Sequence, residues 1–322
     1  MYKVGDQVLE NQLKLNANEG YDYLNQSYHR YPAPKVLYQE FAQFYGVDQN
    51  ELLMTSGVDG SLDIIFKWLK INGGKIVSFS PTYGFYKILA AQLGLQYEEV
   101  PFLEGGSFSQ EALTKLIDQN TLIILCRPNN PTGDLTDQSL LKKLLELKAN
   151  VLLDEAYVEF EENGTLIDWI HEHENLIVCR TLSKAYGLAG LRIGFTFTNA
   201  KLIEEFLPFL PPYPIPTSNL EILKKLFKDQ YFSFCQEQFP KIRERRSRLR
   251  AVMSIFGETF EPHANFITLR SKQAQSLYEN GKVAGFVFRY FNFGSYELLR
   301  VTIPSEKNID QVCSFFQKEK KV

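Results

Sequence analysis

Three short polar segments hold the residue types that catalysis uses, and each follows an apolar run. TLIILC leads into Arg127-Pro-Asn-Asn-Pro-Thr-Gly133, NVLL into Asp154-Glu-Ala-Tyr157, and NLIVCR into Thr181-Leu-Ser-Lys184. Carboxylates, phenols, hydroxyls and a lysine amine can pair with charge, donate hydrogen bonds, move protons and form covalent bonds. Each residue alone is weak evidence, because an aspartate after a strand usually caps a helix and a lone lysine is usually solvated. The prediction of a site rests on their conjunction.

The elements that must position these segments are short strands alternating with helical patterns. The apolar runs KIVSFS (75–80), TLIILC (121–126), NVLLDE (150–155), NLIVCR (175–180) and RIGFTF (192–197) lack strict alternation, as expected of strands buried on both faces. Amphipathic stretches lie between them, so the pattern predicts an α/β domain with a mainly parallel central sheet flanked by helices. In such sheets ligands bind beyond the carboxyl ends of the strands. We therefore expect Asn130, Asp154, Tyr157, Ser183 and Lys184 to converge.

A proline cluster marks the expected boundary between two domains. Pro211, Pro212, Pro214 and Pro216 cannot continue a helix or a central strand. We expect a large ligand-binding domain at 31–210 and a smaller α+β domain at 211–322, which ends in short strands such as NFITLR and ELLRVTI. Residues 1–30 are expected to form an N-terminal arm that joins the small domain.

Composition excludes several classes of function. The chain has 322 residues, of which 44% are hydrophobic and 23% charged, and its net charge of -3 gives no reason to expect nucleic acid. No apolar run approaches a membrane span or a secretory signal, and the four cysteines lie far apart. We expect a cytoplasmic protein without disulfides or a bound metal. The basic run KIRERRSRLR (241–250) is expected to be a solvated helix face.

Seven segments together resemble one known family. They are LNANE (15–19), HRYP (29–32), PTYGFY (81–86), PNNPTG (128–133), LDEAYVEF (153–160), TLSKAYGLAGLRIGF (181–195) and LLRVTI (298–303). In order and spacing they resemble the fold-type I aminotransferases that depend on pyridoxal 5'-phosphate (PLP), and most closely the histidinol-phosphate aminotransferase branch. The resemblance covers nearly the whole chain, and its most specific parts are Asp-Glu-Ala-Tyr and Ser-Lys, 30 residues apart.

The resemblance implies a role for each polar residue around the cofactor ring. Lys184 is implied to form the Schiff base with PLP and to move the substrate proton. Asp154 is implied to pair with the pyridine nitrogen, and Asn130 and Tyr157 to bond the phenolate oxygen. Tyr83 is implied to stack on the ring, although a core aromatic is the alternative reading. PLP itself supplies the electron sink.

The resemblance also implies a cradle for the cofactor phosphate. Val58, Asp59 and Gly60 open a helix whose N–H groups and dipole favour an anion. Thr181, Ser183 and Arg192 are implied to complete the cradle. Tyr31 is similar to a family tyrosine that reaches the phosphate of the partner subunit's site, so a homodimer with shared sites is implied.

The substrate implied by the resemblance is L-histidinol phosphate, with 2-oxoglutarate as the amino acceptor. Arg300 is implied to grip the substrate's acidic group, and Arg289 falls near a second arginine used for phosphate. Asn18, Tyr31 and Asn130 are implied to line the substrate pocket. Three alternatives stay open: an aminotransferase for aromatic or other amino acids, a threonine-phosphate decarboxylase and a catalytically silent PLP-binding regulator. A nicotinamide-binding domain is excluded because no G-x-G-x-x-G follows the first strand.

Overall fold

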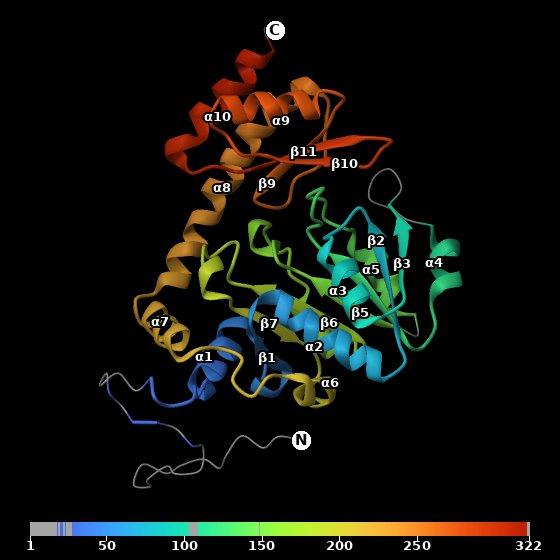
Figure 1. Ribbon diagram of the computed structural model, residues 1–322, viewed down its shortest axis with the longest axis vertical. Coiled ribbons are helices and arrows are strands. Elements are labelled where there is room, and N and C mark those ends of the chain that lie inside the picture. Colours follow the sequence, from blue (N-terminus) through green and yellow to red (C-terminus); the bar gives the residue numbers. More distant parts are fainter. Residues whose placement is uncertain are drawn as a thin grey trace.

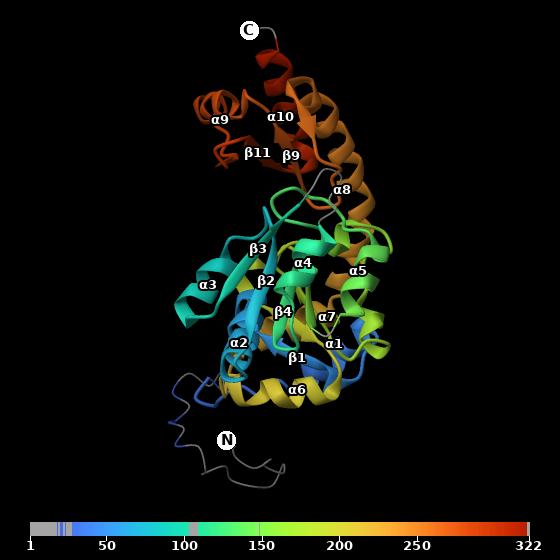
Figure 2. The ribbon, with the colours of Figure 1, turned by 90° about the vertical axis from the view of Figure 1, so that its right-hand side faces the viewer.

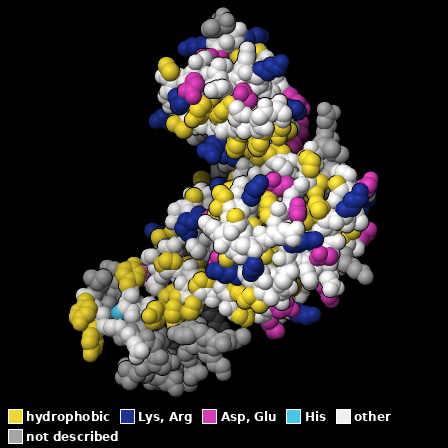
Figure 3. Space-filling view, turned by 45° about the vertical axis from the view of Figure 1, so that its right-hand side comes forward, with side chains coloured by type: hydrophobic (Ala, Val, Ile, Leu, Met, Phe, Trp, Pro, Cys, Tyr) yellow, Lys and Arg dark blue, Asp and Glu magenta, His cyan; other side chains and the backbone are white. Residues whose placement is uncertain are grey.

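The computed structural model describes residues 28–102, 109–147 and 149–320, together with Asn18, Gly20, Tyr21 and Tyr23. Most of the expected N-terminal arm, and all of the LNANE segment except Asn18, lie outside these described residues. The described chain forms two lobes, and Figure 1 shows the larger lobe below and the smaller lobe above. A hollow separates the two lobes on one side of the molecule (Figure 3).

The large lobe is built on a central sheet, as the apolar runs predicted. Its described strands are β1 (Leu52–Thr55), β2 (Lys75–Ser80), β3 (Tyr97–Pro101), β4 (Thr121–Cys126), β5 (Asn150–Asp154), β6 (Leu176–Thr181) and β7 (Gly194–Phe197), in the order β1-β7-β6-β5-β4-β2-β3. Strands β3, β2, β4, β5 and β6 run parallel, whereas β7 is antiparallel to both β6 and β1. The link from β6 to β7 is short and lacks an α-helix, so it cannot make the crossover that a parallel pair needs.

Helices cover both faces of this sheet, because successive strand residues point to opposite sides. Val151 and Leu153 face one core and Leu152 faces the other. The first core is closed by α1 (Lys35–Tyr45), α4 (Gln110–Leu116), α5 (Gln138–Leu145) and α7 (Thr217–Lys228). The second core is closed by α2 (Gly57–Ile71), α3 (Phe85–Leu93) and α6 (Ala200–Phe206). Short 3₁₀ helices lie at Gln49–Glu51, Val158–Phe160, Ile167–His171, Ala189–Leu191, Leu207–Phe209 and Ser254–Phe256.

The small lobe is an antiparallel sheet with helices on one face. Its described strands are β8 (Glu258–Thr259), β9 (Phe266–Arg270), β10 (Arg289–Asn292) and β11 (Glu297–Thr302), in the order β10-β11-β9-β8. Helices α9 (Ala274–Val283) and α10 (Glu306–Glu319) pack on it around a separate core that includes Leu269, Leu299 and Phe316. The strands expected at NFITLR and ELLRVTI are β9 and β11.

One long helix, α8 (Tyr231–Met253), belongs to both lobes (Figure 2). Phe232 and Phe239 from its first half lie in the large core, and Leu249 and Met253 from its second half lie in the small core. The division between the cores therefore falls within α8, later than the boundary expected at residue 210. The reason is that α7, which follows the proline cluster, completes the large core through its own apolar face.

The basic run of α8 is helical, but the expectation of a merely solvated face is wrong. Its arginines pair with acidic residues from other elements: Arg243 with Glu162, Arg245 with Glu306, Arg246 with Glu161, Arg248 with Asp310 and Arg250 with Glu261. The more exposed of these pairs contribute about 0–1 kcal/mol each. Arg246 and Glu161 are more buried, at 11% and 23% exposed, and all five pairs fix the position of the helix against both lobes. Among the described residues, no helix is long and apolar enough to cross a membrane.

The N-terminus of α2 lies directly against β7, and two glycines allow this approach. A Cβ on Gly194 would lie 2.3 Å from the carbonyl carbon of Gly57 and 2.7 Å from the backbone nitrogen of Val58. Gly57 itself has a φ of 74°, a backbone conformation that is strained for residues with a side chain. The start of α2 is thereby placed beside the ends of β6 and β7.

We predict that Gly194→Ala lowers the free energy of unfolding by about 1–3 kcal/mol, the usual effect of forcing extra atoms into a packed site. Urea unfolding of the purified protein measures the change. The matched control is Gly190→Ala, where a Cβ would meet nothing within 4 Å. Equal stability of the two variants would contradict this account of the α2–β7 contact.

Candidate active site

The polar segments predicted from the sequence meet at one edge of the large sheet. Strands β4, β5 and β6 are parallel neighbours, so Asn130, Asp154 and Ser183, which end or follow them, lie together. A single pocket is lined by side chains from these ends and from the start of α2. Its lining residues are Val58, Asp59, Tyr83, Cys126, Asn130, Asp154, Ala156, Tyr157, Thr181, Ser183, Lys184, Ala189 and Arg192.

Asp154 forms the floor of the pocket and is only 3% exposed. Its Oδ2 accepts a hydrogen bond of 2.5 Å from the Tyr86 hydroxyl, and its Oδ1 accepts one of 3.1 Å from the Ala156 N–H. Burial raises the pKa of Asp154 to about 6, while the Tyr86 and Ala156 bonds act in the opposite direction. No ion pair to Asp154 forms among the described residues, so this carboxylate faces the pocket ready for a cationic partner.

Lys184 and Tyr157 face each other across the pocket. The Lys184 Nζ lies 5.6 Å from the centre of the Tyr157 ring, within the range of a cation–π contact. The Tyr157 hydroxyl accepts a 3.4 Å hydrogen bond from the Asn130 amide, and Asn130 Oδ1 in turn accepts one from Arg300. Burial raises the pKa of Tyr157 well above its usual value, which keeps the phenol protonated and able to donate. An amine and a phenol therefore share one small space.

The side of the pocket near α2 is suited to an anion. Val58 and Asp59 lie in the first turn of this helix, where backbone N–H groups have no partner within the helix. Thr55 and Ser61 brace that turn, with their hydroxyl oxygens 2.8 Å apart. Gly60 belongs to the same turn but not to the pocket lining.

Hydroxyl and guanidinium groups complete this side. The Ser183 N–H donates a 3.1 Å bond to the Thr181 hydroxyl oxygen, which orients both side chains beside the pocket. Arg192, held in a left-handed conformation at φ 51°, reaches Asp59 Oδ2 at 2.9 Å. A bound phosphate at this place would meet N–H groups, hydroxyls and a guanidinium.

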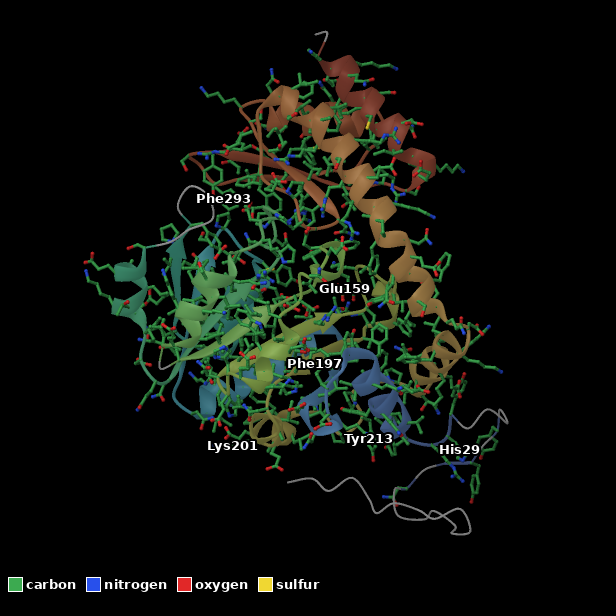
Figure 4. The ribbon with its side chains drawn as sticks, turned by 180° about the vertical axis from the view of Figure 1, so that it is seen from behind. His29, Glu159, Phe197, Lys201, Tyr213 and Phe293 are labelled. Carbon is green, nitrogen blue, oxygen red and sulfur yellow. The ribbon has the colours of Figure 1, made fainter. Side chains whose placement is uncertain are left out.

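A buried ion pair lies behind the pocket. Arg180 Nη2 is 2.8 Å from Glu159 Oε1, and the two side chains are 8% and 4% exposed (Figure 4 labels Glu159). Arg180 precedes Thr181 and Glu159 lies two residues after Tyr157, so the pair ties together the two segments that supply the pocket. Removing one partner of such a pair typically costs about 3–5 kcal/mol, because an unpaired buried charge remains.

Two arginines expected to bind the substrate come from the small lobe and do not line the pocket themselves. Arg300 contacts the pocket by donating to Asn130, whereas Arg289 is exposed. Arg289 on β10 and Arg300 on β11 are directly opposite each other in the antiparallel register, so both side chains leave the same face of the sheet. Both guanidinium carbons lie 5.5 Å from the centre of the Phe291 ring. Burial, followed by smaller effects that include the charge of Arg289, holds the pKa of Arg300 below its usual value. Among the described residues, neither arginine forms an ion pair with a carboxylate.

Two of the predicted residues lie elsewhere. Tyr31 stacks on Tyr213, with ring centres 4.1 Å apart, and Tyr213 lies at the end of the large lobe remote from the small lobe (Figure 4). Asn18 is exposed and does not line the pocket. Among the described residues, no group of three or more His, Cys, Asp or Glu side chains is placed to hold a metal ion.

Sequence reasoning missed three residues that shape the site. Tyr86 bonds Asp154, Cys126 lines the pocket beside it, and Phe291 lies under both arginines. The spacing of Tyr83 and Tyr86 in PTYGFY was the available signal, since residues three apart share one face where a helix begins. Cys126 and Phe291 gave no signal, because each reads as an ordinary strand residue.

The residues present fit the PLP cofactor. A buried carboxylate suits a protonated ring nitrogen, and Lys184 opens onto the same pocket. Among the described residues, neither Asp154 nor Lys184 forms an ion pair. The helix N-terminus, two hydroxyls and Arg192 suit a phosphate. Tyr83 is the second aromatic residue of the lining, besides Tyr157.

Comparisons with known proteins agree with this geometry. The family model of aminotransferase class I and II matches residues 2–316. A histidinol-phosphate aminotransferase of Blochmanniella floridana is 33% identical, over 95% of this chain and 90% of that protein. A histidine biosynthesis bifunctional protein of Photorhabdus laumondii is 32% identical over 92% of this chain, which spans only 39% of that longer protein.

A solved structure has the same fold. It is the histidinol-phosphate aminotransferase of Sinorhizobium meliloti in complex with pyridoxal-5'-phosphate. It superposes with a TM-score of 0.79 at 22% identity, over 91% of this chain and 83% of that one.

The burial of Asp154 predicts a pH dependence of stability in the protein freed of cofactor. Because the pKa of about 6 in the folded state lies above the unfolded value of 3.8, folding favours the protonated carboxyl, and ionisation of Asp154 lowers the free energy of unfolding. The stability is fully present below pH 3.8 and is lost as the pH rises through 6. We predict that the unfolding free energy of the wild type falls by about 2–3 kcal/mol relative to Asp154→Asn between pH 4 and pH 7. If the unfolding free energies of the wild type and Asp154→Asn, measured by urea unfolding, changed in parallel with pH, the argument from burial would be contradicted.

Proposed function

The chain belongs to the class I and II aminotransferase family, and from this premise we propose that it transfers the amino group of L-histidinol phosphate to 2-oxoglutarate. It is a PLP-dependent aminotransferase, since this family uses that cofactor and the pocket fits it. The identity of the amino donor is the proposed part. Its support comes from the names of the relatives and from the two arginines beside the pocket.

The arginine pair is the observation on which the choice of substrate rests. A phosphate monoester carries nearly two negative charges at neutral pH, and each guanidinium can bind two of its oxygens. Arg289 and Arg300 stand opposite each other with no carboxylate partner among the described residues, so a doubly charged group can take both. A substrate with a single carboxylate needs only one of them. Arg300 is also bonded to Asn130, which places the gripped end of the substrate near Lys184.

Three side chains of the pocket are proposed to act on the reacting atoms. When bound, PLP supplies the electron sink that stabilises charge on the substrate carbon. Lys184 holds the cofactor covalently and then moves the proton at the substrate carbon, which its position in the pocket allows. Asp154 holds a positive charge at the ring nitrogen. Tyr157, oriented by Asn130, donates a hydrogen bond to the ring oxygen.

The remaining pocket residues are proposed to hold the cofactor in place. Tyr83 covers one face of the ring. The phosphate is held by the backbone at Val58, Asp59 and Gly60, by the hydroxyls of Thr181 and Ser183, and by Arg192.

We also propose a homodimer in the cytoplasm. Tyr31 lies on the side of the large lobe remote from the small lobe, so it cannot serve the pocket of its own chain while stacked on Tyr213. It is half exposed, at 48%, so part of its ring lies at the surface of the chain. Asn18 is proposed to act with it in lining the substrate pocket. The four cysteines are free and buried, which fits a reducing compartment.

One prediction of this proposal concerns covalent attachment. Borohydride reduction of the holoenzyme followed by peptide mapping should place the phosphopyridoxyl mass on Lys184, because this lysine opens onto the pocket opposite Asp154. Lys184→Arg, treated in the same way, should give no labelled peptide. A label on a different lysine in the wild type would overturn the assignment.

A further prediction concerns the amino donor. Arg289→Ala should lower kcat/KM for histidinol phosphate by a factor that corresponds to a loss of about 1.5–3 kcal/mol of transition-state stabilisation, the range for hydrogen bonds to a charged group. The kcat/KM for an aromatic amino acid should change little. Arg300→Ala should lower kcat/KM for every substrate. Steady-state kinetics with the two donors measures both effects.

The matched control is Arg270→Ala, an arginine of the same small sheet that lies near Glu258 and should not alter the preference between donors. Small and equal losses for both donors with Arg289→Ala would remove the support for a phosphorylated substrate. A general aminotransferase would then be the better interpretation.

A further inference from the structure

Tyr86 makes the shortest side-chain contact with the pocket carboxylate, and nothing in the motif comparison assigned it a role. We propose that Tyr86 is a positioning residue that keeps the Asp154 carboxylate ionised and aimed at the cofactor ring nitrogen. The proposal rests on the cofactor that the family uses and not on the choice of amino donor. A different donor would leave it standing.

The contact is closed off from water. Tyr86 on α3 is 0% exposed and Asp154 at the end of β5 is 3% exposed. The hydroxyl lies 2.5 Å from Oδ2, at the short end of the range for a hydrogen bond to a charged oxygen. The other carboxylate oxygen accepts the Ala156 N–H at 3.1 Å. With one donor on each oxygen, the plane and direction of the carboxylate are set by two different segments of the chain.

The direction of the hydrogen bond follows from the surroundings. Burial, reinforced by the charge of Asp154, holds the pKa of Tyr86 well above its usual range, so the phenol keeps its proton at neutral pH and is the donor. Burial raises the pKa of Asp154, and the Tyr86 bond is the largest of the influences that oppose this rise.

The other groups that face Asp154 have smaller effects. Asp59 on α2 disfavours the ionised carboxylate, and Lys184 favours it. Cys126 on β4 and Cys179 on β6 are buried thiols whose pKa is raised, so they stay neutral beside it. The ionised state of Asp154 therefore depends more on Tyr86 than on any other side chain facing it.

This matters because one proton is shared when the ring nitrogen lies opposite Asp154. The proton rests either on the nitrogen, leaving a carboxylate, or on the carboxyl, leaving a neutral nitrogen. Both arrangements hold the same atoms and the same total charge. A donor to the carboxylate stabilises the first arrangement, in which the ring is charged. Loss of the Tyr86 hydroxyl therefore shifts the shared proton from the ring nitrogen toward Asp154. The site neither takes up a proton from solvent nor releases one.

The competing interpretation is that Tyr86 is only a packed core ring. It meets Tyr83 edge to face, with centres 5.4 Å apart, and lies in the core formed by α2 and α3. Phenylalanine at this position keeps those contacts and removes only the hydroxyl. Tyr86→Phe thus separates the two interpretations.

The experiment reconstitutes Tyr86→Phe with PLP labelled with ¹⁵N at the ring nitrogen and records its NMR chemical shift. The shift should move toward the value of the unprotonated ring, and the dissociation constant of PLP, from absorbance titration of the cofactor-free protein, should rise about tenfold. The control is Tyr38→Phe, which removes a half-buried hydroxyl that accepts the Met54 N–H on the far side of β1. It should change neither quantity.

A double-mutant cycle with Asp154→Asn tests whether Tyr86 acts through Asp154. In the Asp154→Asn background, Tyr86→Phe should have almost no further effect on PLP affinity, because the carboxylate it served is absent. The double variant also removes both partners of the bond, so it folds without a buried carboxylate short of a donor. An unchanged ¹⁵N shift in Tyr86→Phe, or additive losses of affinity in the cycle, would overturn the proposal.

Discussion

The buried carboxylate of Asp154 is the constraint on which the rest of the site depends. A charge withdrawn from water is costly unless it is paired and hydrogen-bonded, and here Tyr86 and Ala156 supply hydrogen bonds. Within the part of the chain that the structure describes, no cationic side chain forms an ion pair with Asp154, so a ligand has to supply that partner. The end of the central strand β5 is the one place where such a group can be flanked by the ends of β4 and β6, which bring Asn130 and Lys184 to it. The location of the pocket therefore follows from the sheet.

The proposed substrate end of the site lies where the small lobe contacts the large one. The segment after β4 is held from above by three contacts: the Arg300 guanidinium on Asn130, the Thr268 hydroxyl on the Pro131 carbonyl, and the His263 N–H on the Gly133 carbonyl at 2.9 Å. Phe266 also meets Tyr157 edge to face. Because α8 is shared by both cores, these contacts join two lobes that are already tied together, and a shift of the small lobe would move the arginines relative to Lys184.

Much of this was predictable from local patterns. Apolar runs located β2 and β4 to the residue, and β5, β6 and β7 to within two residues, because strands buried on both faces are continuous in their apolar character. The parallel direction of neighbouring strands then implied that the polar segments after them converge. The boundary between the lobes was harder to predict from the sequence. A proline cluster marks a break in regular structure, but whether the next helix joins one core or another depends on which apolar surfaces remain uncovered, and α7 covers the large one.

The sequence by itself determined the family, the strands β2, β4, β5, β6 and β7 of the large sheet and the polar segments that follow β4, β5 and β6, because these depend on residue type and spacing along the chain. Only the tertiary structure decided which residues meet across long separations. Tyr86 reaches Asp154 over 68 positions, and Arg300 reaches Asn130 over 170. The opposition of Arg289 and Arg300 depends on a strand register, and the exclusion of water from Asp154 depends on helices packed from both faces of the sheet. Register and burial are properties of packed surfaces, and for that reason no local pattern contains them.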